Sequence, residues 1–347
     1  MKYDKTGGFS SLGEFMSRVR AACDNDGGVD SRLIKTTGHY AENDDTEGGY
    51  LVPDEWADGI YEAAALEGAI VRPRARVFKT TSDSLNIRTL IDSSRSSNIF
   101  GGITFTWVAE AGNLATGISA PTLGSIGLTP HKLVGTCYAP RELEQDHGAF
   151  GQIMEASFGA AIRYVEDDYY INGTGSGQIQ GVLGSDACIL VPRSQDGLIT
   201  YDDLTAMVKR LLPASWGSAV WLVNPDVMDD WLSADAIESG ASVQDSLDTN
   251  TRKLLGFPFI VTEKCQALGT SGDCLLADFR HYAIADRGLS IMGSRHVDVS
   301  NVGFKTDQTF WRVTLRVDGQ PLLNSAITPK HGANTLSAFV ALTDFTS

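Results

Sequence analysis

The sequence has no long apolar run and no signature of secretion. Its longest apolar runs, such as 219–223 and 257–261, are far shorter than the roughly 20 residues needed to span a bilayer, so no transmembrane segment and no membrane partner are expected. The first residues are charged and then amphipathic, without the continuous apolar stretch and small-residue cleavage site of a secretory signal. We therefore expect a protein that is made and kept in the cytosol.

Cysteine pairs and an excess of basic residues are also missing. The five cysteines form no CxxC pair, and the six histidines lack metal-ligand spacing, so we predict reduced, mostly buried thiols, no metal and no cofactor. The formal net charge of −15 argues against a sequence-reading DNA-binding protein, because such proteins gain much of their affinity from Lys and Arg contacts to phosphates.

Motifs of catalysis are missing as well. There is no G-x-S-x-G element, no zincin motif and no P-loop. The glycine-rich stretch 173–177 follows a predicted helix instead of opening one, which is the reverse of a dinucleotide-binding loop. Glu166, Asp167 and Asp168 occupy consecutive helix positions that point in different directions, so a solvated face is favoured over an acid–base pair. We predict no catalytic residue.

The chain of 347 residues, 42% of them hydrophobic, is long enough for about two domains with a real core. Residues 7–22 predict a short helix, in which Ser11 and Glu14 form a capping box. Its single apolar stripe consists of Leu12, Phe15, Met16 and Val19. The polar stretches 24–30 and 36–49 follow, and a segment so poor in core residues is either disordered or an arm laid on another surface. Of these two alternatives, we favour the arm.

Residues 76–108 change to a period of two, which predicts two long strands around residues 85–90 and 103–107. The polar tip 93–98 joins them into a hairpin that reaches roughly 35 to 40 Å. A lone two-stranded ribbon is marginally stable in water, so this one needs a neighbouring surface. An ordinary hairpin within a sheet is the alternative.

The strongest predicted helix covers residues 149–171, which corresponds to roughly 34 Å. After residue 196, helices and strands alternate: Thr200 and Asp203 cap a helix, and 219–223 is a buried strand. The stretch 233–252 is polar and predicts a long loop. Further strands are predicted around Phe259, Leu275, Ile284 and Val313. The fold class is α+β.

Three landmarks, in order along nearly the whole chain, resemble those of the Hong Kong 97-type major capsid proteins of tailed bacteriophages. The first is Glu47–Pro53 (EGGYLVP). The second is Trp107–Glu110 (WVAE), followed by Pro140–Asp146 (PRELEQD). The third combines Leu254–Pro258 (LLGFP), Asp278–Arg287 (DFRHYAIADR) and Arg316–Gly319 (RVDG). Each landmark is weak alone, and together they are specific.

The resemblance implies a Hong Kong 97-like fold with an N-arm, an extended E-loop hairpin, a P-domain with a long spine helix, and an α/β A-domain. The implied ranges are 1–53 for the N-arm, 76–108 for the E-loop, 54–75 and 109–196 for the P-domain with spine helix 149–171, and 197–347 for the A-domain, with C-terminal strands at about 296–330 returning to the P-domain. It also implies a structural, non-enzymatic subunit that self-assembles into hexamers and pentamers of an icosahedral shell.

That shell would enclose phage double-stranded DNA without sequence-specific binding, as part of a virion assembled in the host cytoplasm. Scaffolding, portal and decoration proteins are the other partners implied. The candidates for contacts between subunits are Phe15 in the arm helix, Arg95 at the hairpin tip, Trp107 and Glu110 at the E-loop base, and Arg280, Asp286 and Arg287 in the A-domain. Asp278 and Asp286 flank Arg280 and Arg287, where salt bridges or subunit contacts are simpler explanations than catalysis.

Two features depart from parts of that family. The hairpin tip offers Arg95 but no lysine, so covalent cross-linking of the shell through a lysine is not expected. The arm helix begins within about ten residues of Met1, so we expect scaffolding to be either a separate protein or a segment already removed. Two alternatives remain: an encapsulin-type nanocompartment shell with the same fold, and a soluble α/β enzyme with its site in the second domain.

Overall fold

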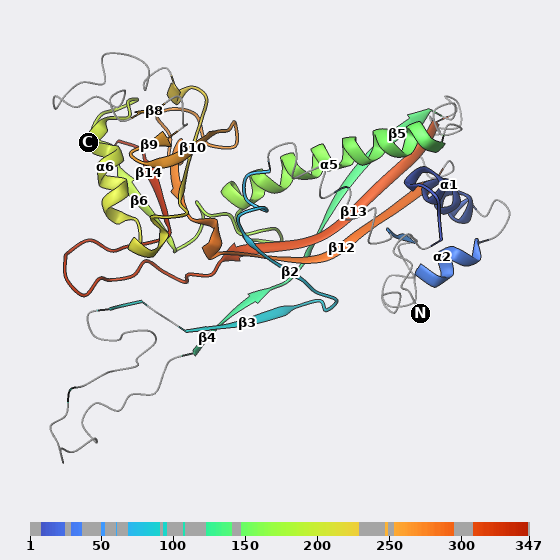
Figure 1. Ribbon diagram of the computed structural model, residues 1–347, viewed down its shortest axis with the longest axis horizontal. Helices are drawn as coiled ribbons and strands as arrows, with labels where there is room; N and C mark the ends of the chain where they lie inside the picture. The colour runs from blue at the N-terminus through green and yellow to red at the C-terminus, as the bar shows by residue number, and fades with distance from the viewer. Residues whose placement is uncertain are drawn as a thin grey trace.

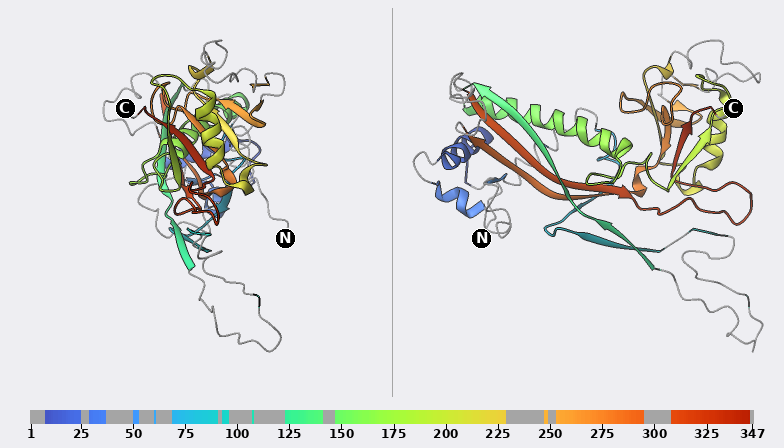
Figure 2. Two further views of the ribbon diagram at one scale, coloured as in Figure 1. Left: turned by 90° about the vertical axis from the view of Figure 1, so that its left-hand side faces the viewer. Right: turned by 180° about the vertical axis from the view of Figure 1, so that it is seen from behind.

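The computed structural model describes residues 8–24, 29–36, 50–52, 60, 69–90, 93–95, 107, 123–140, 147–228, 247–248, 253–294 and 308–345. The molecule is elongated, with a long helix lying along a twisted five-stranded sheet, here called the long sheet (Figure 1). A seven-stranded sheet, the second sheet, stands at one end, and a two-stranded ribbon projects from the body (Figure 2). No helix in the described part of the chain is long and apolar enough to cross a membrane.

The long helix is α5 (His147–Asn172), which confirms the helix predicted over 149–171. Its buried face repeats at helical spacing and comprises Phe150, Met154, Phe158 and Ile162. The helix ends at Gly173, where a Cβ atom would lie 2.2 Å from the carbonyl oxygen of Ile179. Only glycine permits the chain to turn back this closely on the end of the helix.

The long sheet has the strand order β1-β12-β13-β5, and β2 pairs in parallel with β12. Its strands are β1 (Tyr50–Leu51), β2 (Arg76–Lys79), β5 (His131–Pro140), β12 (Tyr282–Ser294) and β13 (Gln308–Pro321). Alternate side chains of β13 are buried toward the core with α5, and the Trp311 ring lies 5.6 Å from that of Phe150. The paired strands therefore form a rigid layer behind the helix.

The second sheet has the order β6-β14-β11-β7-β10-β9-β8. Its strands are β6 (Cys188–Pro192), β7 (Val220–Val223), β8 (Leu247–Asp248), β9 (Lys253–Leu254), β10 (Phe257–Val261), β11 (Cys274–Ala277) and β14 (Phe339–Thr343). Helix α6 (Tyr201–Arg210) packs on one face and begins with the predicted Thr200–Asp203 capping box. The other face joins the core around α5 through Leu222, Leu275 and Ala341.

The division of the chain between the two sheets differs from the predicted ranges. Strands β12 and β13 both lie in the long sheet and fall within the range 197–347, which was predicted as the A-domain with strands at about 296–330 returning to the P-domain. Strand β6 belongs to the second sheet although it precedes residue 197. The 3-10 turn η3 (Phe279–His281) connects β11 to β12 and so links the two sheets. Apart from β8, the predicted loop 233–252 lies outside the described residues.

The N-terminal segment contains α1 (Leu12–Cys23) and α2 (Ser31–Thr36). Helix α1 packs on α5 and β12 of its own subunit, and its predicted stripe of Leu12, Phe15, Met16 and Val19 is buried. Gly13 and Gly151 allow the close approach, since a Cβ on Gly151 would lie 2.7 Å from the backbone nitrogen of Gly13. This part of the predicted arm therefore lies on the body of its own subunit. Residues 37–49 lie outside the described part.

Candidate assembly surfaces

The ribbon consists of β3 (Leu85–Leu90) and β4 (Leu123–Leu128), paired antiparallel from Leu85 opposite Leu128 to Leu90 opposite Leu123. The predicted pairing of residues 85–90 with 103–107 is therefore wrong. Strand β2 (Arg76–Lys79), which lies within the range 76–108 predicted for the E-loop, pairs with β12 in the long sheet. Except for Trp107, the stretch 103–108 lies outside the described residues.

One face of the ribbon is packed at its base. Leu128 lies in a small cluster with Ala283 and Ala285 of β12, and Leu85 and Ile87 pack against this cluster. The opposite face is exposed and carries Asn86, Arg88, Ser125 and Gly127. The ribbon therefore has an apolar side toward its own body and a polar side toward the surroundings.

Three polar contacts fix both strands of the ribbon to the long sheet. The Asp318 carboxylate accepts from the backbone N–H of Thr129 at 2.6 Å, and the Gln320 side chain donates to the Gly127 carbonyl at 3.1 Å. Beside the start of β3, Arg287 forms an ion pair with Asp83. Burial raises the pKa of Asp318, and the hydrogen bonds from the Thr129 and Gly319 N–H groups offset part of this rise. These contacts set where the ribbon leaves the body.

A buried charge cluster joins three segments of the body at this base. Arg72 donates two hydrogen bonds to Glu166 of α5, at 3.0 and 2.6 Å, and a third to Asp286 of β12 at 2.9 Å. The side chains of Arg72, Glu166 and Asp286 are only 13%, 4% and 4% exposed. Next along α5, the Asp167 carboxylate accepts from the backbone N–H groups of Ile70 and Val71.

The prediction of a solvated face for Glu166 and Asp167 is therefore wrong. Both carboxylates are buried because the segment 69–75 crosses α5 and supplies them with a guanidinium and two backbone donors. Burial raises the pKa of Glu166, although the charge of Arg72 opposes this. Burial by itself would lower the pKa of Arg72, but the negative charge of Glu166 holds that pKa well above its usual range.

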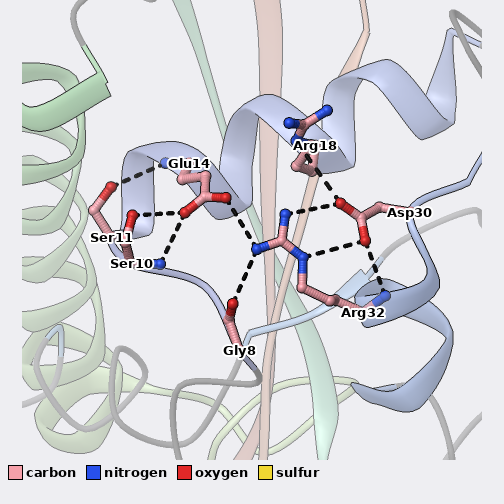
Figure 3. A network of polar contacts seen from close by, with 7 residues as sticks. All are labelled: Gly8, Ser10, Ser11, Glu14, Arg18, Asp30 and Arg32. Atoms are coloured by element: carbon pink, nitrogen blue, oxygen red, sulfur yellow. Dashed lines mark hydrogen bonds and ion pairs between the residues drawn. The ribbon is translucent and has the colours of Figure 1, made fainter.

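The N-terminal helices are held together by Arg32 (Figure 3). Its guanidinium donates to the Asp30 carboxylate at 3.2 and 2.9 Å, lies 3.0 Å from a Glu14 carboxylate oxygen, and donates to the Gly8 carbonyl. It also lies 4.3 Å from the centre of the Phe9 ring. Hydrogen bonds from Ser10 and then Arg32 lower the pKa of Glu14 to about 2, and those from Arg32 lower the pKa of Asp30 to about 2.

The start of α1 differs in one detail from the predicted capping box. The Ser11 hydroxyl accepts from the Glu14 N–H at 3.2 Å, as predicted. The Glu14 carboxylate instead accepts from the backbone N–H and the hydroxyl of Ser10, at 2.8 and 2.6 Å. The helix start and Arg32 thus share one carboxylate, which couples α1 to α2.

Three of the predicted contact residues lie at different depths in the subunit. Trp107 is fully exposed, whereas Phe15 is 0% exposed in the subunit's own core and offers no surface to a neighbour. Arg95 is half-buried, and its backbone N–H donates to Thr328. Glu110 lies outside the described residues.

The other three candidates surround the start of β12. Arg280 is 53% exposed and donates to Asp278, so the predicted salt bridge there is present. Asp286 is buried with Arg72, and Arg287 pairs with Asp83, so Asp286 and Arg287 belong to the long sheet and not to the second unit where they had been placed. Of these three residues, only Arg280 has a side chain that is about half exposed.

Exposed apolar side chains on two strands were missed by sequence reasoning. Tyr138 and Val134 on β5 are 62% and 44% exposed, and Leu123 on β4 is 59% exposed. Among the described residues β5 is an edge of the long sheet, and edge strands with exposed apolar side chains pair readily with other chains. The pattern His131–Pro140 does not alternate cleanly between polar and apolar residues, so it gave no signal.

Among the described residues, no group of three or more His, Cys, Asp or Glu side chains is placed to hold a metal ion. The five cysteines are free, and burial raises the pKa of Cys188 and Cys265 to about 12. The glycine-rich stretch 173–177 is the first part of a short hairpin in which Thr174 pairs with Gln180.

Comparison with known proteins identifies the family to which this fold belongs. The model of the phage capsid family matches residues 48–330. The solved capsid of an empty GTA particle is 15% identical, with 80% of this chain and 90% of that chain covered and a TM-score of 0.59. A structure from Mycobacterium phage Bobi is 15% identical, covers 81% and 91%, and has a TM-score of 0.54. A search of curated protein sequences finds no significant match. The chain belongs to the phage capsid family and is a capsid shell subunit.

Proposed function

We propose that this chain is the major head subunit of a tailed bacteriophage, which assembles into hexamers and pentamers of an icosahedral shell around double-stranded DNA. The ribbon carries this proposal. It is a two-stranded element whose base alone is packed on the long sheet, and it projects from the body (Figure 2). Because a lone ribbon is marginally stable in water, a surface on another subunit supports it best.

The ribbon of one subunit would lie on its neighbour, whose own ribbon lies on the next. Such head-to-tail contacts close into rings around symmetry axes. The exposed apolar residues Leu123, Val134 and Tyr138 add area to these contacts. Obligate interfaces of this kind bury more than about 2,000 Å² in total.

We keep the names of the four parts as proposals, with ranges that follow the two sheets. The E-loop corresponds to residues 81–128, the spine helix to 147–172, and the A-domain to 188–277 with the return of the chain at 337–345. The rest of the long sheet belongs to the P-domain. Because α1 is packed on its own subunit, any arm that reaches a neighbour would come from another part of residues 1–53.

The same proposal covers the contents and the setting of the shell. With a net charge of −15, the subunit would enclose DNA without reading its sequence and without catalysis. Assembly would take place in the host cytoplasm, with scaffolding, portal and decoration proteins as further partners, and the product would be the virion head. The matching family model is that of phage capsids, which favours a phage head over the alternative of an encapsulin-type nanocompartment.

A shortened ribbon tests this function. Ile87 lies opposite Ile126, so residues 88–125, which include the projecting half of the ribbon, can be replaced by Asn-Gly, the favoured two-residue turn of a hairpin. We expect this variant to fold with an unchanged far-UV spectrum and to remain as small oligomers, while the unaltered chain forms particles in light scattering. Closed particles from the shortened variant would contradict the role of the ribbon, and an unaltered chain that stays monomeric under all conditions would contradict the function.

A further inference from the structure

The chain between β13 and β14 forms a strap that is anchored to the second sheet. Ile327 and Leu336 pair with each other through two backbone hydrogen bonds of 2.7 and 2.8 Å, which closes residues 327–336 into a hairpin. The return strand is fixed at Ser337, whose N–H donates to Arg210 and whose carbonyl accepts from Leu212. The buried side chain of Ser337 also donates to the Ala187 carbonyl. The hairpin 327–336, here called the strap, therefore moves with the second sheet.

The strap holds the chain just beyond the end of β3. The N–H of Arg95 donates to the Thr328 carbonyl at 2.7 Å, and the N–H of Thr328 donates to the Ser93 carbonyl at 2.9 Å, which places Ser94 opposite Thr328 in a parallel bridge. Figure 1 shows the strap reaching out from the end of β13 toward this segment of the chain. The ribbon is thus attached at its base to the long sheet and beyond β3 to the second sheet.

We propose that this bridge is an intramolecular latch, which holds the ribbon on its own subunit before assembly and opens when the ribbon moves onto a neighbour. The inference rests on the proposed function, in which the ribbon binds a neighbouring copy. Ser93 and Thr328 are exposed, and each exposed backbone hydrogen bond gained in folding replaces one to water, so the latch is weak enough to open. While it is closed, it covers backbone groups that would otherwise pair with other chains at random.

A reversible cross-link tests the latch. Residues opposite each other in adjacent strands are close enough for a disulfide, so Ser94→Cys combined with Thr328→Cys creates a lock that oxidation closes and reduction opens. Peptide mapping shows whether the bond has formed within one subunit. We expect oxidised subunits to form particles at least about tenfold more slowly than the same subunits after reduction. The reason is that the disulfide must break before the ribbon can move onto a neighbouring subunit. The single variants Ser94→Cys and Thr328→Cys, oxidised in parallel, control for the five native cysteines.

The possible outcomes separate the latch from the function. Intramolecularly locked subunits that assemble as fast as reduced ones would overturn the latch, and so would a bond found only between two subunits of a shell. Failure of the unaltered chain to assemble would instead overturn the proposed function.

A second variant covers the case in which the disulfide does not form. Thr328→Pro removes the N–H that donates to Ser93, and residue 328 precedes Pro329, which favours extended conformations that a proline residue can also adopt. We expect Thr328→Pro to assemble several-fold faster than Thr328→Ala, which keeps that N–H. Equal rates for the two variants would overturn the latch.

Discussion

The buried cluster of Arg72, Glu166 and Asp286 makes the sharpest prediction about stability. Replacing Arg72 by Met keeps much of the side-chain volume and leaves two buried carboxylates without their cation. Removing one partner of a buried ion pair costs about 3–5 kcal/mol, because the remaining charge is desolvated and uncompensated. We therefore expect the melting temperature of unassembled Arg72→Met subunits to fall on the order of 10 °C.

The loss should depend on pH in a defined direction. In the folded chain the pKa of Glu166 is raised, so the folded state holds this proton more tightly than the unfolded state does. The stability gained from that proton is fully present below the ordinary pKa of Glu166 and is lost as the pH rises through the raised value. Without Arg72 the pKa rises further, so the deficit of Arg72→Met should be larger at about pH 7 than at about pH 5.

Thermal unfolding at low protein concentration and low salt, followed by circular dichroism, measures both effects. Arg88→Met on the exposed face of the ribbon is the matched control, which we expect to change stability by no more than about 0.5 kcal/mol. Adding Glu166→Gln to Arg72→Met should restore part of the loss. A variant within about 3 °C of the unaltered subunit, or a deficit that grows as the pH falls, would show that the cluster does not hold the segment 69–75 to α5.

Three further predictions concern other parts of the molecule. Gly151→Ala should destabilise the subunit by about 1–3 kcal/mol in urea titrations, because its Cβ would press on the backbone of Gly13; an unchanged midpoint would refute the close packing of α1 on α5. The contributions of Glu14 and Asp30 to stability should be constant above their ordinary pKa values and lost as the pH falls toward about 2, so the protection of α1 amides, relative to their intrinsic exchange rates, should fall only there. Assembly should accelerate as salt rises from about 0.01 M to about 0.1 M, which shortens the screening length from roughly 30 to 10 Å; slowing over this range would contradict repulsion between subunits of charge −15.

The elements with a clear period could be predicted from the sequence. The helix over 149–171, the α1 stripe and the buried strand at 219–223 all have apolar residues at the spacing of their structures, and the structure contains them. The Thr200–Asp203 capping box is local and needs no tertiary information. Family membership was also accessible, because the landmarks extend along most of the chain and the family model covers 48–330.

Long-range contacts could not be predicted in the same way. The stretch 103–107 alternates more clearly than Leu123–Leu128, which contains two glycines, so the wrong partner was assigned to β3. Glu166 looked solvated because its partner Arg72 lies 94 residues earlier in the chain, beyond any helical period. Phe15 was offered to a neighbour because nothing local shows that α5 and β12 of the same subunit bury it.

The central claim is that this subunit closes a shell by laying its ribbon on its neighbours. Negative-stain electron microscopy of the purified chain, with particle mass from light scattering, tests it most directly. We expect angular, closed particles of uniform size, tens of nanometres across, whose symmetry averages show rings of five and six subunits. A stable monomer over the full range of concentration and salt, with or without coexpressed scaffolding protein, would contradict the claim.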